Sequence, residues 1–202
     1  MIMRILVIGG SGTIGKAVVK ELSPRHEVLV VGRSAGDLRC DTTSEESIRE
    51  MFVKAGEFDA VVTATGRVPF EEFSKLKADH YLAGLNDKLM GQVNVVRIGS
   101  EYIRERGSFT LTSGILGRSP VRASCAAATV NGALESFVKA AAIELPKQIR
   151  INVICPTIIQ ESMDKYGAYF RGFDPVPLAK VALAYSKSVE GLQTGQVYEV
   201  LY

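Results

Sequence analysis

Short apolar runs alternate with stretches of helical periodicity along the whole chain. Seven runs predict strands, at residues 5–8, 28–31, 38–41, 59–63, 108–111, 151–154 and 196–200. After the first run, Ile14, Val18 and Leu22 recur four positions apart, which predicts a helix with one apolar stripe. Because strands and helices alternate, we expect a parallel sheet with helices on both of its faces.

The other helices are predicted from their caps and apolar stripes. Thr43 and Glu46 have the spacing of a capping box, ahead of a helix with an apolar stripe up to Ala55. A longer helical stretch reaches about residue 104 and is expected to break near Gly84, because glycine is a poor helix former. Further helices are predicted at 123–145 and 178–189, with residues 161–177 irregular or weakly helical.

Glycines follow the first predicted strand directly and open the first helix. Backbone N–H groups at a helix start attract a diphosphate, provided that no side chain blocks its approach. Gly9 is expected to make the tight turn, Gly12 to admit the diphosphate and Gly15 to let the helix pack on the strand. In this setting the spacing predicts a dinucleotide site, and the neighbouring binding residues are Ser11, Thr13 and Ile14.

This motif makes the predicted fold a Rossmann fold: one doubly wound α/β domain over residues 1–202, with about seven parallel strands. The length of 202 residues and a hydrophobic fraction of 47% suit a single domain with one sizeable core. Ligands of such sheets bind beyond the carboxyl ends of the strands, so the site is expected there.

Composition excludes several other classes of protein. The net charge is +2, and basic and acidic residues are interleaved, so nucleic acid is not an expected partner. No apolar stretch is long enough to cross a membrane, and no cysteine and histidine cluster has the spacing of a metal site. Three widely spaced cysteines, Cys40, Cys125 and Cys155, fit reduced thiols in a cytoplasmic protein.

The end of the second predicted strand bears on which dinucleotide is bound. NAD sites usually place a carboxylate there to accept from the ribose 2′-hydroxyl, whereas this chain has Arg33 and Ser34. A guanidinium and a hydroxyl suit a 2′-phosphate, so NADP(H) is favoured over NAD(H). The alternative is that Arg33 is a solvated loop charge. Asp41, which ends the third strand, either accepts from the adenine amino group or only turns the chain.

With these features the chain resembles the short-chain dehydrogenase/reductase family over essentially its whole length. The residues that carry the resemblance are Gly9–Gly15, Asp41, Ala64-Thr65-Gly66, Leu111-Thr112-Ser113, the helix 131–145, the strand 151–156 and the terminal 195–200. Ala64, Thr65 and Gly66 stand where the family has a turn under the adenine ring. The resemblance also implies that Pro156 ends a strand at the nicotinamide, with backbone groups of Ile159 on the carboxamide.

The resemblance breaks at the catalytic positions. The family uses Asn, Ser and a Tyr-x-x-x-Lys motif, in which the tyrosine is the general acid or base. Here the tyrosine position falls at Ala127 and the lysine position at Asn131, while Ser113 is kept and Lys88 stands at the asparagine position. We hypothesise that lysine and asparagine have exchanged places, so that Lys88 and Asn131 face one another. The alternative is a solvent-facing Lys88 and a polar remnant at Asn131.

Two main functions stay open on this basis, and a third alternative is a different reaction on the same fold, such as isomerisation or epimerisation. One is an NADP(H)-dependent oxidoreductase for a small carbonyl or alcohol substrate with an altered acid/base, using Ser113, Lys88 and Asn131. The other is a catalytically inactive dinucleotide-binding sensor or partner-binding module, which the loss of both tyrosine and lysine favours. Tyr81, Tyr166 and Tyr169 are weak candidates to replace the missing tyrosine. The resemblance also implies a homodimer or homotetramer, formed through the helices after the fourth and fifth strands.

Overall fold

The computed structural model, which describes residues 2–202, contains the seven-stranded parallel sheet that the alternating pattern predicts. Its strand order is β3-β2-β1-β4-β5-β6-β7, so the direction of winding reverses between β1 and β4. The strands are β1 (Arg4–Ile8), β2 (Glu27–Gly32), β3 (Leu38–Arg39), β4 (Ala60–Thr63), β5 (Ser108–Thr112), β6 (Arg150–Pro156) and β7 (Val197–Val200). The doubly wound Rossmann fold is therefore confirmed.

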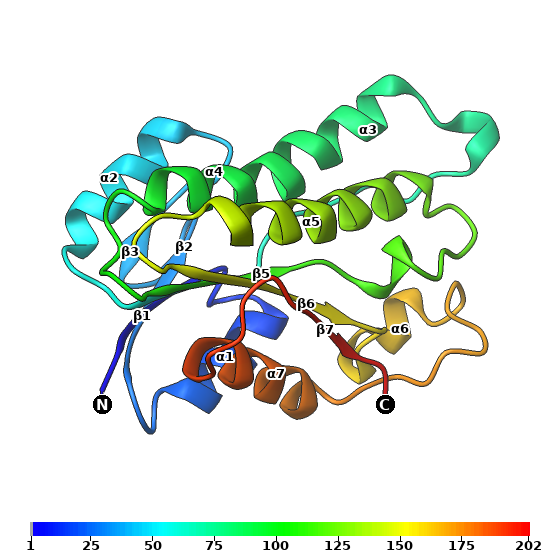
Figure 1. Cartoon of the computed structure of the whole chain (residues 1–202). Helices are drawn as coiled ribbons and strands as arrows, with labels where there is room; N and C mark the ends of the chain where they lie inside the picture. The colour runs from blue at the N-terminus through cyan, green and yellow to red at the C-terminus, as the bar shows by residue number, and fades with distance from the viewer. Residues whose placement is uncertain (1) are drawn as a thin grey trace.

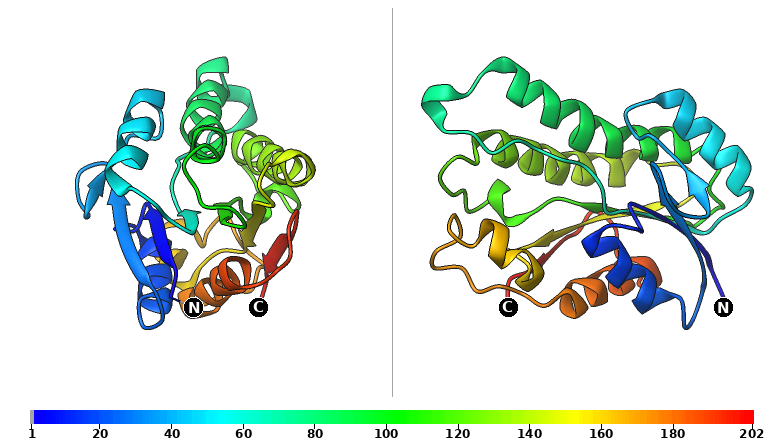
Figure 2. Two further views of the ribbon diagram at one scale, coloured as in Figure 1. Left: turned by 60° about the vertical axis from the view of Figure 1, so that its left-hand side comes forward. Right: turned by 180° about the vertical axis from the view of Figure 1, so that it is seen from behind.

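Helices cover both faces of the sheet (Figures 1 and 2). One face carries α1 (Thr13–Leu22) and α7 (Leu178–Glu190). The other carries α2 (Glu45–Ala55), α3 (Ala78–Gly84), α4 (Gly91–Gly99) and α5 (Cys125–Glu144). Successive residues of β1 point to opposite faces, so Ile5 and Val7 pack with α1 and α7, whereas Leu6 and Ile8 join the core under the other helices.

Short helical turns lie mostly near the carboxyl ends of the strands. They are η1 (Phe73–Lys75), η3 (Ile115–Gly117), η4 (Gln160–Ser162) and α6 (Met163–Tyr166). The last two lie in the segment between β6 and α7, which Figure 1 shows at the same end of the sheet as the C-terminus. This agrees with the irregular or weakly helical structure expected for residues 161–177.

The predicted capping box of α2 is wrong by one residue. The N-cap is Ser44, whose Oγ accepts from the backbone N–H of Ser47 at 3.2 Å. Thr43 does not cap the helix because its hydroxyl donates to Asp41 Oδ1 at 2.7 Å. The apolar stripe of α2 is buried as expected.

The predicted break at Gly84 is also corrected. The helix α3 ends at Gly84 and continues directly into a π-helical turn, η2 (Leu85–Met90), which leads into α4. Gly84 is a packing residue, because an added Cβ would lie 2.8 Å from Val68 Cγ1. The chain leaves α4 at Gly99, earlier than the expected end near residue 104.

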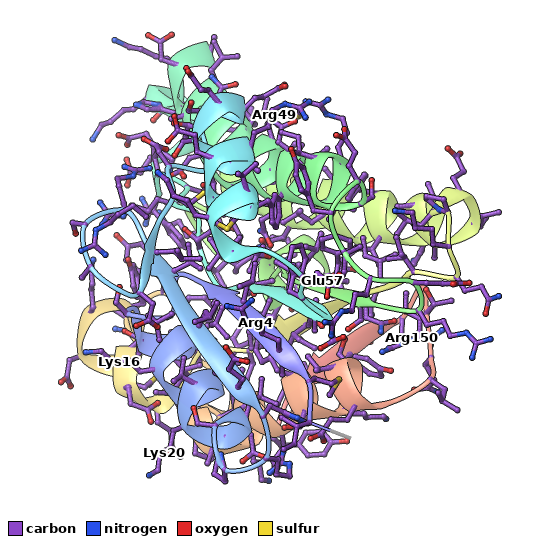
Figure 3. The ribbon with its side chains drawn as sticks, turned by 90° about the vertical axis from the view of Figure 1, so that its left-hand side faces the viewer. Arg4, Lys16, Lys20, Arg49, Glu57 and Arg150 are labelled. Carbon is purple, nitrogen blue, oxygen red and sulfur yellow. The ribbon has the colours of Figure 1, made fainter. Side chains whose placement is uncertain are left out.

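Two arginines at the amino ends of strands hold helix C-termini. Arg4 Nη1 donates to Ala55 O at 2.7 Å at the end of α2, beside Glu57, and Figure 3 labels Arg4 and Glu57 at this edge. Arg150 does the same for α7, donating to Ser188 O and Val189 O at 2.8 and 2.9 Å. These bonds satisfy carbonyls that a helix end leaves free. Side chains at the amino ends of the strands thus stabilise helix termini, and a ligand site is expected at the carboxyl ends.

Candidate functional site

The glycine turn has the geometry of a diphosphate cradle. Gly9 adopts φ +83°, and an added Cβ would lie 2.5 Å from Ala64 O, so this position requires glycine. A Cβ on Gly15 would lie 2.0 Å from Gly9 O, which shows that the helix packs directly against the turn. Gly12 differs, because its Cβ would meet only Gly9 O, at 3.2 Å. A side chain there would occupy the groove, so the open space beside Gly12 fits a dinucleotide diphosphate.

A groove of about 630 Å³ continues from this turn across the carboxyl ends of β1, β2 and β4. Most of the residues predicted to bind the dinucleotide line it, namely Gly9, Ser11, Gly12, Thr13, Arg33, Ser34, Ala64, Thr65 and Gly66. The N-cap of α1 has no side-chain hydrogen bond, so the N–H groups of its first turn have no capping side chain. Lys16 and Lys20 are exposed on α1 (Figure 3) and line a neighbouring hollow that shares Ser11, Gly12 and Thr13 with the groove.

Arg33 lies where the groove passes the end of β2 and is 64% exposed in its side chain. Its Nη2 is 3.3 Å from Asp41 Oδ1, an ion pair at the surface that contributes little stability. Hydrogen bonds from the Thr43 side chain and backbone, together with Arg33, hold the pKa of Asp41 below its usual range. Asp41 does not line the groove, and its carboxylate is occupied by Thr43 and Arg33.

The structure brings Lys88 and Asn131 together, as the exchange hypothesis requires. Lys88 Nζ donates to Asn131 Oδ1 at 2.7 Å and to Ser113 O at 3.0 Å. Burial lowers the pKa of the Lys88 ammonium to about 8. The stem of Lys88 passes over Gly66, which has φ +107° and whose added Cβ would lie 2.6 Å from Lys88 Cα. The alternative of a solvent-facing Lys88 is therefore wrong.

Gln92 is a residue of this site that the sequence analysis missed. It is fully buried, and its Nε2 donates to Lys88 O at 3.2 Å and to Thr112 O at 3.0 Å. Its Oε1 accepts from Thr63 Oγ1 and from the Thr112 backbone N–H. Gln92 thus ties the π-helical turn that carries Lys88 to β4 and β5. The sequence offers one signal that Gln92 belongs to the site. Gln92 is a polar residue within a mostly apolar helical stretch, four residues after Lys88.

Ser113 follows β5, and its hydroxyl points toward a buried carboxylate. Ser113 Oγ donates to Glu135 Oε1 at 3.3 Å, and Glu135 Oε2 in turn accepts from Arg118 Nε at 2.9 Å. Arg118 also pairs with Glu199. Next to Ser113 and Glu135, burial raises the pKa of the Cys155 thiol to about 12, so that this thiol is not a reactive nucleophile at neutral pH.

A second, largely apolar cavity of about 240 Å³ adjoins the polar cluster. Pro156 and Ile159, which were predicted to hold the nicotinamide end, line it together with Ile14 of the phosphate turn and with Lys88, Ser113 and Asn131. Its apolar walls come from both sides of the cleft, and they are Phe70, Ile115, Leu116, Ile158 and Phe170. Of the tyrosines considered as replacements, Tyr166 lines the cavity and packs against Phe70, with ring centroids 5.8 Å apart.

Residues 2–202 contain no group of three or more His, Cys, Asp or Glu side chains placed to hold a metal ion. Over the same residues, no helix combines the length and apolar character needed to cross a membrane.

Comparisons with known proteins show the family of this chain. Residues 12–188 match the family described as Enoyl-(Acyl carrier protein) reductase. Among curated proteins, the chain is 26% identical over 181 residues to 3-oxoacyl-[acyl-carrier-protein] reductase of Bos taurus, covering 79% of this chain and 76% of that protein. It is also 26% identical to human L-xylulose reductase, over 79% of this chain and 73% of that protein.

Solved structures match over nearly the whole chain. The protein lin1944 from Listeria innocua is 45% identical, with a TM-score of 0.96, covering 98% of this chain and 99% of that one. A small-chain dehydrogenase in complex with NADPH is 28% identical, with a TM-score of 0.89 over 99% of this chain and 97% of that one. The chain belongs to the short-chain dehydrogenase/reductase family of oxidoreductases, whose members bind a nicotinamide dinucleotide.

Proposed function

We propose that this protein is an NADP(H)-dependent oxidoreductase that acts on a small carbonyl or alcohol substrate with an altered acid/base group. The observation that carries the proposal is the position of Lys88 Nζ, which lies between Asn131 Oδ1 and Ser113 O. Lys88 lines the apolar cavity and packs on Gly66, which lines the dinucleotide groove. The family's tyrosine position holds Ala127, so another group must handle the proton.

NADP(H), when bound, supplies or accepts the hydride. The glycine turn would hold its diphosphate, while Pro156 and the backbone of Ile159 would orient the nicotinamide end. Hydride addition to a carbonyl leaves an alkoxide, so a proton donor must lie within hydrogen-bond reach. Lys88 is that donor, directly or through a water next to Ser113, and Asn131 holds the ammonium in place. Because the pKa of Lys88 is about 8, the ammonium is protonated at neutral pH.

Arg33 and Ser34 support NADP(H) over NAD(H). The guanidinium is exposed at the ribose end, and a 2′-phosphate offers it a stronger, bidentate partner than Asp41 does. The solved relative with NADPH points the same way. Dissociation constants for the two reduced cofactors test this choice, and tighter binding of NADH would refute it.

The activity itself is tested by NADPH oxidation with a panel of aldehydes, ketones and quinones. Turnover should fall at least 100-fold in Lys88→Met and tenfold or more in Ser113→Ala, while NADPH affinity changes less than threefold. For carbonyl reduction, kcat/KM should fall above about pH 8, because only protonated Lys88 donates a proton. Turnover that is insensitive to Lys88→Met would refute the role of Lys88.

A second candidate is a catalytically inactive dinucleotide-binding sensor or partner-binding module. Ala127 and Asn131 favour it, since neither can transfer a proton, and so does Ser113, whose hydroxyl is directed to Glu135. Tight NADPH binding without turnover of any substrate in the panel would select this candidate.

We also propose a homodimer or homotetramer in the cytoplasm. Exposed apolar side chains on α3, η2 and α5, namely Leu82, Met90 and Ile143, support the assembly. Free Cys40, Cys125 and Cys155 support a reducing compartment.

A further inference from the structure

The apolar cavity contains one unusual feature, a cation without a counter-ion. Lys88 is the one Lys, Arg, Asp or Glu among the described residues that line it. Its ammonium has three N–H donors, and two of them are used by Asn131 Oδ1 and Ser113 O. Both acceptors are neutral. Across residues 2–202, no carboxylate forms an ion pair with Lys88.

Such a charge is costly to the protein. Charges withdrawn from water are normally paired, because desolvation is otherwise uncompensated. Lys88 is partly buried, and this desolvation is the reason that its pKa is lowered. An anionic oxygen at the free N–H of Lys88 would supply the missing charge. The same position lies at the end of the cavity where the proposed substrate oxygen would be, so the inference rests on the proposed function.

The rest of the cavity limits what can carry that oxygen. Aliphatic and aromatic side chains form its walls, and Phe70 and Tyr166 pack together from the two sides of the cleft. A cavity of about 150 Å³ is sufficient for benzene, so about 240 Å³ accepts a single substituted ring as long as no nicotinamide occupies the part that Pro156 and Ile159 line. No second cation lines the cavity to bind another charged group.

We propose that Lys88 is an oxyanion-binding residue, and that the cavity takes a small one-ring or similarly compact apolar molecule whose single anionic oxygen lies on Lys88 Nζ. A phenolate or an enolate is the ground-state form of such a ligand. The matching substrate class is an apolar carbonyl compound with no other charged group, whose oxygen becomes negative as the hydride arrives. Molecules with an additional phosphate or carboxylate are excluded, because the apolar walls cannot solvate them.

The probe for this proposal is p-nitrophenol, whose phenolate form absorbs visible light and whose neutral form does not. The purified protein is titrated with the probe below the pKa of the free phenol. We expect the bound probe to absorb as phenolate, with its pKa lowered by at least one unit, a tenfold preference for the anion. The uncharged analogue p-nitroanisole should bind at least tenfold more weakly.

Variants distinguish the contribution of the Lys88 charge to probe binding from that of the apolar walls. Lys88→Met and, should it fold poorly by circular dichroism, Lys88→Gln should abolish the phenolate absorbance. Phe170→Ala should weaken probe binding about tenfold while the bound probe still absorbs as phenolate. Lys139→Met, which replaces an exposed lysine of α5, is the matched control and should behave as the wild type.

The outcomes distinguish this inference from the proposed enzyme. Phenolate bound on Lys88 without turnover in the NADPH assay supports the oxyanion site and refutes the enzyme. Turnover without a phenolate signal, or a signal that survives Lys88→Met and Lys88→Gln, overturns the oxyanion site and leaves the enzyme standing.

Discussion

Replacing Lys88 with methionine removes a charge from the site, and its effect on stability should depend on pH. In the unfolded chain a lysine titrates near 10.5, whereas burial lowers the pKa of folded Lys88 to about 8. Below pH 8 both states carry the charge, so the folded state bears the full cost of its burial. Between pH 8 and 10.5 the unfolded chain holds a proton that the folded protein has released, so wild-type stability rises relative to Lys88→Met.

The size of this effect follows from the two pKa values. A fall from 10.5 to about 8 corresponds to roughly 3 kcal/mol of folding free energy. About 2 kcal/mol of it should be regained between pH 7 and pH 9.5, because folded Lys88 is then neutral while the unfolded lysine is still mostly charged. The hydrogen bonds from Lys88 to Asn131 and Ser113 are missing in the variant at every pH. Their loss therefore shifts the free energy of unfolding of the variant by a nearly constant amount and does not change how the difference from wild type varies with pH.

The assay is urea unfolding, followed by circular dichroism at several values between pH 7 and pH 9.5. The quantity of interest is the wild-type free energy of unfolding minus that of Lys88→Met, since other titrating groups cancel in the difference. Lys139→Met, at an exposed position of the same domain, should give a constant difference. Parallel curves for wild type and Lys88→Met would show that the folded lysine titrates normally and would refute the reasoning.

Four further predictions concern the cofactor site, α5 and the assembly. Gly12→Ala should fold with at most a modest loss of stability yet bind NADPH at least tenfold more weakly in a fluorescence titration, because its Cβ enters the groove; unchanged affinity would contradict the cradle. Arg33→Ala should weaken NADPH binding at least tenfold and leave NADH binding nearly unchanged, and an equal loss for both cofactors would contradict a 2′-phosphate contact. Gly132→Ala should raise the unfolding free energy by about 0.5–1 kcal/mol, because nothing lies within 4 Å of the added Cβ in α5; a loss in urea unfolding would show hidden crowding. Light scattering should give a multiple of the 21.9 kDa chain mass, and the mass of one chain would contradict the assembly.

Local patterns determined most of the fold. The predicted segments located all seven strands, and β1 and β4 show why their apolar runs were informative, since a strand buried on both faces needs a continuous apolar sequence. The glycine spacing identified the phosphate turn, because Gly9 and Gly15 must approach neighbouring backbone too closely for any side chain. Where prediction was wrong, the cause was also local: the choice of Ser44 over Thr43 as the cap depends on a hydrogen bond from Thr43 to Asp41.

The sequence by itself led to the prediction that Ala127 and Asn131 stand at the family's catalytic positions and that Lys88 compensates. Only the tertiary structure decided that Lys88 does reach Asn131, because the contact joins residues 43 apart in sequence through the register of two helices. A π-helical turn sets that register, and the buried Gln92 holds it against the sheet. The pattern of apolar positions does not reveal such a turn, because the turn is held by hydrogen bonds to strands that are distant in the chain. The same long-range packing places the unpaired charge of Lys88 in an apolar cavity.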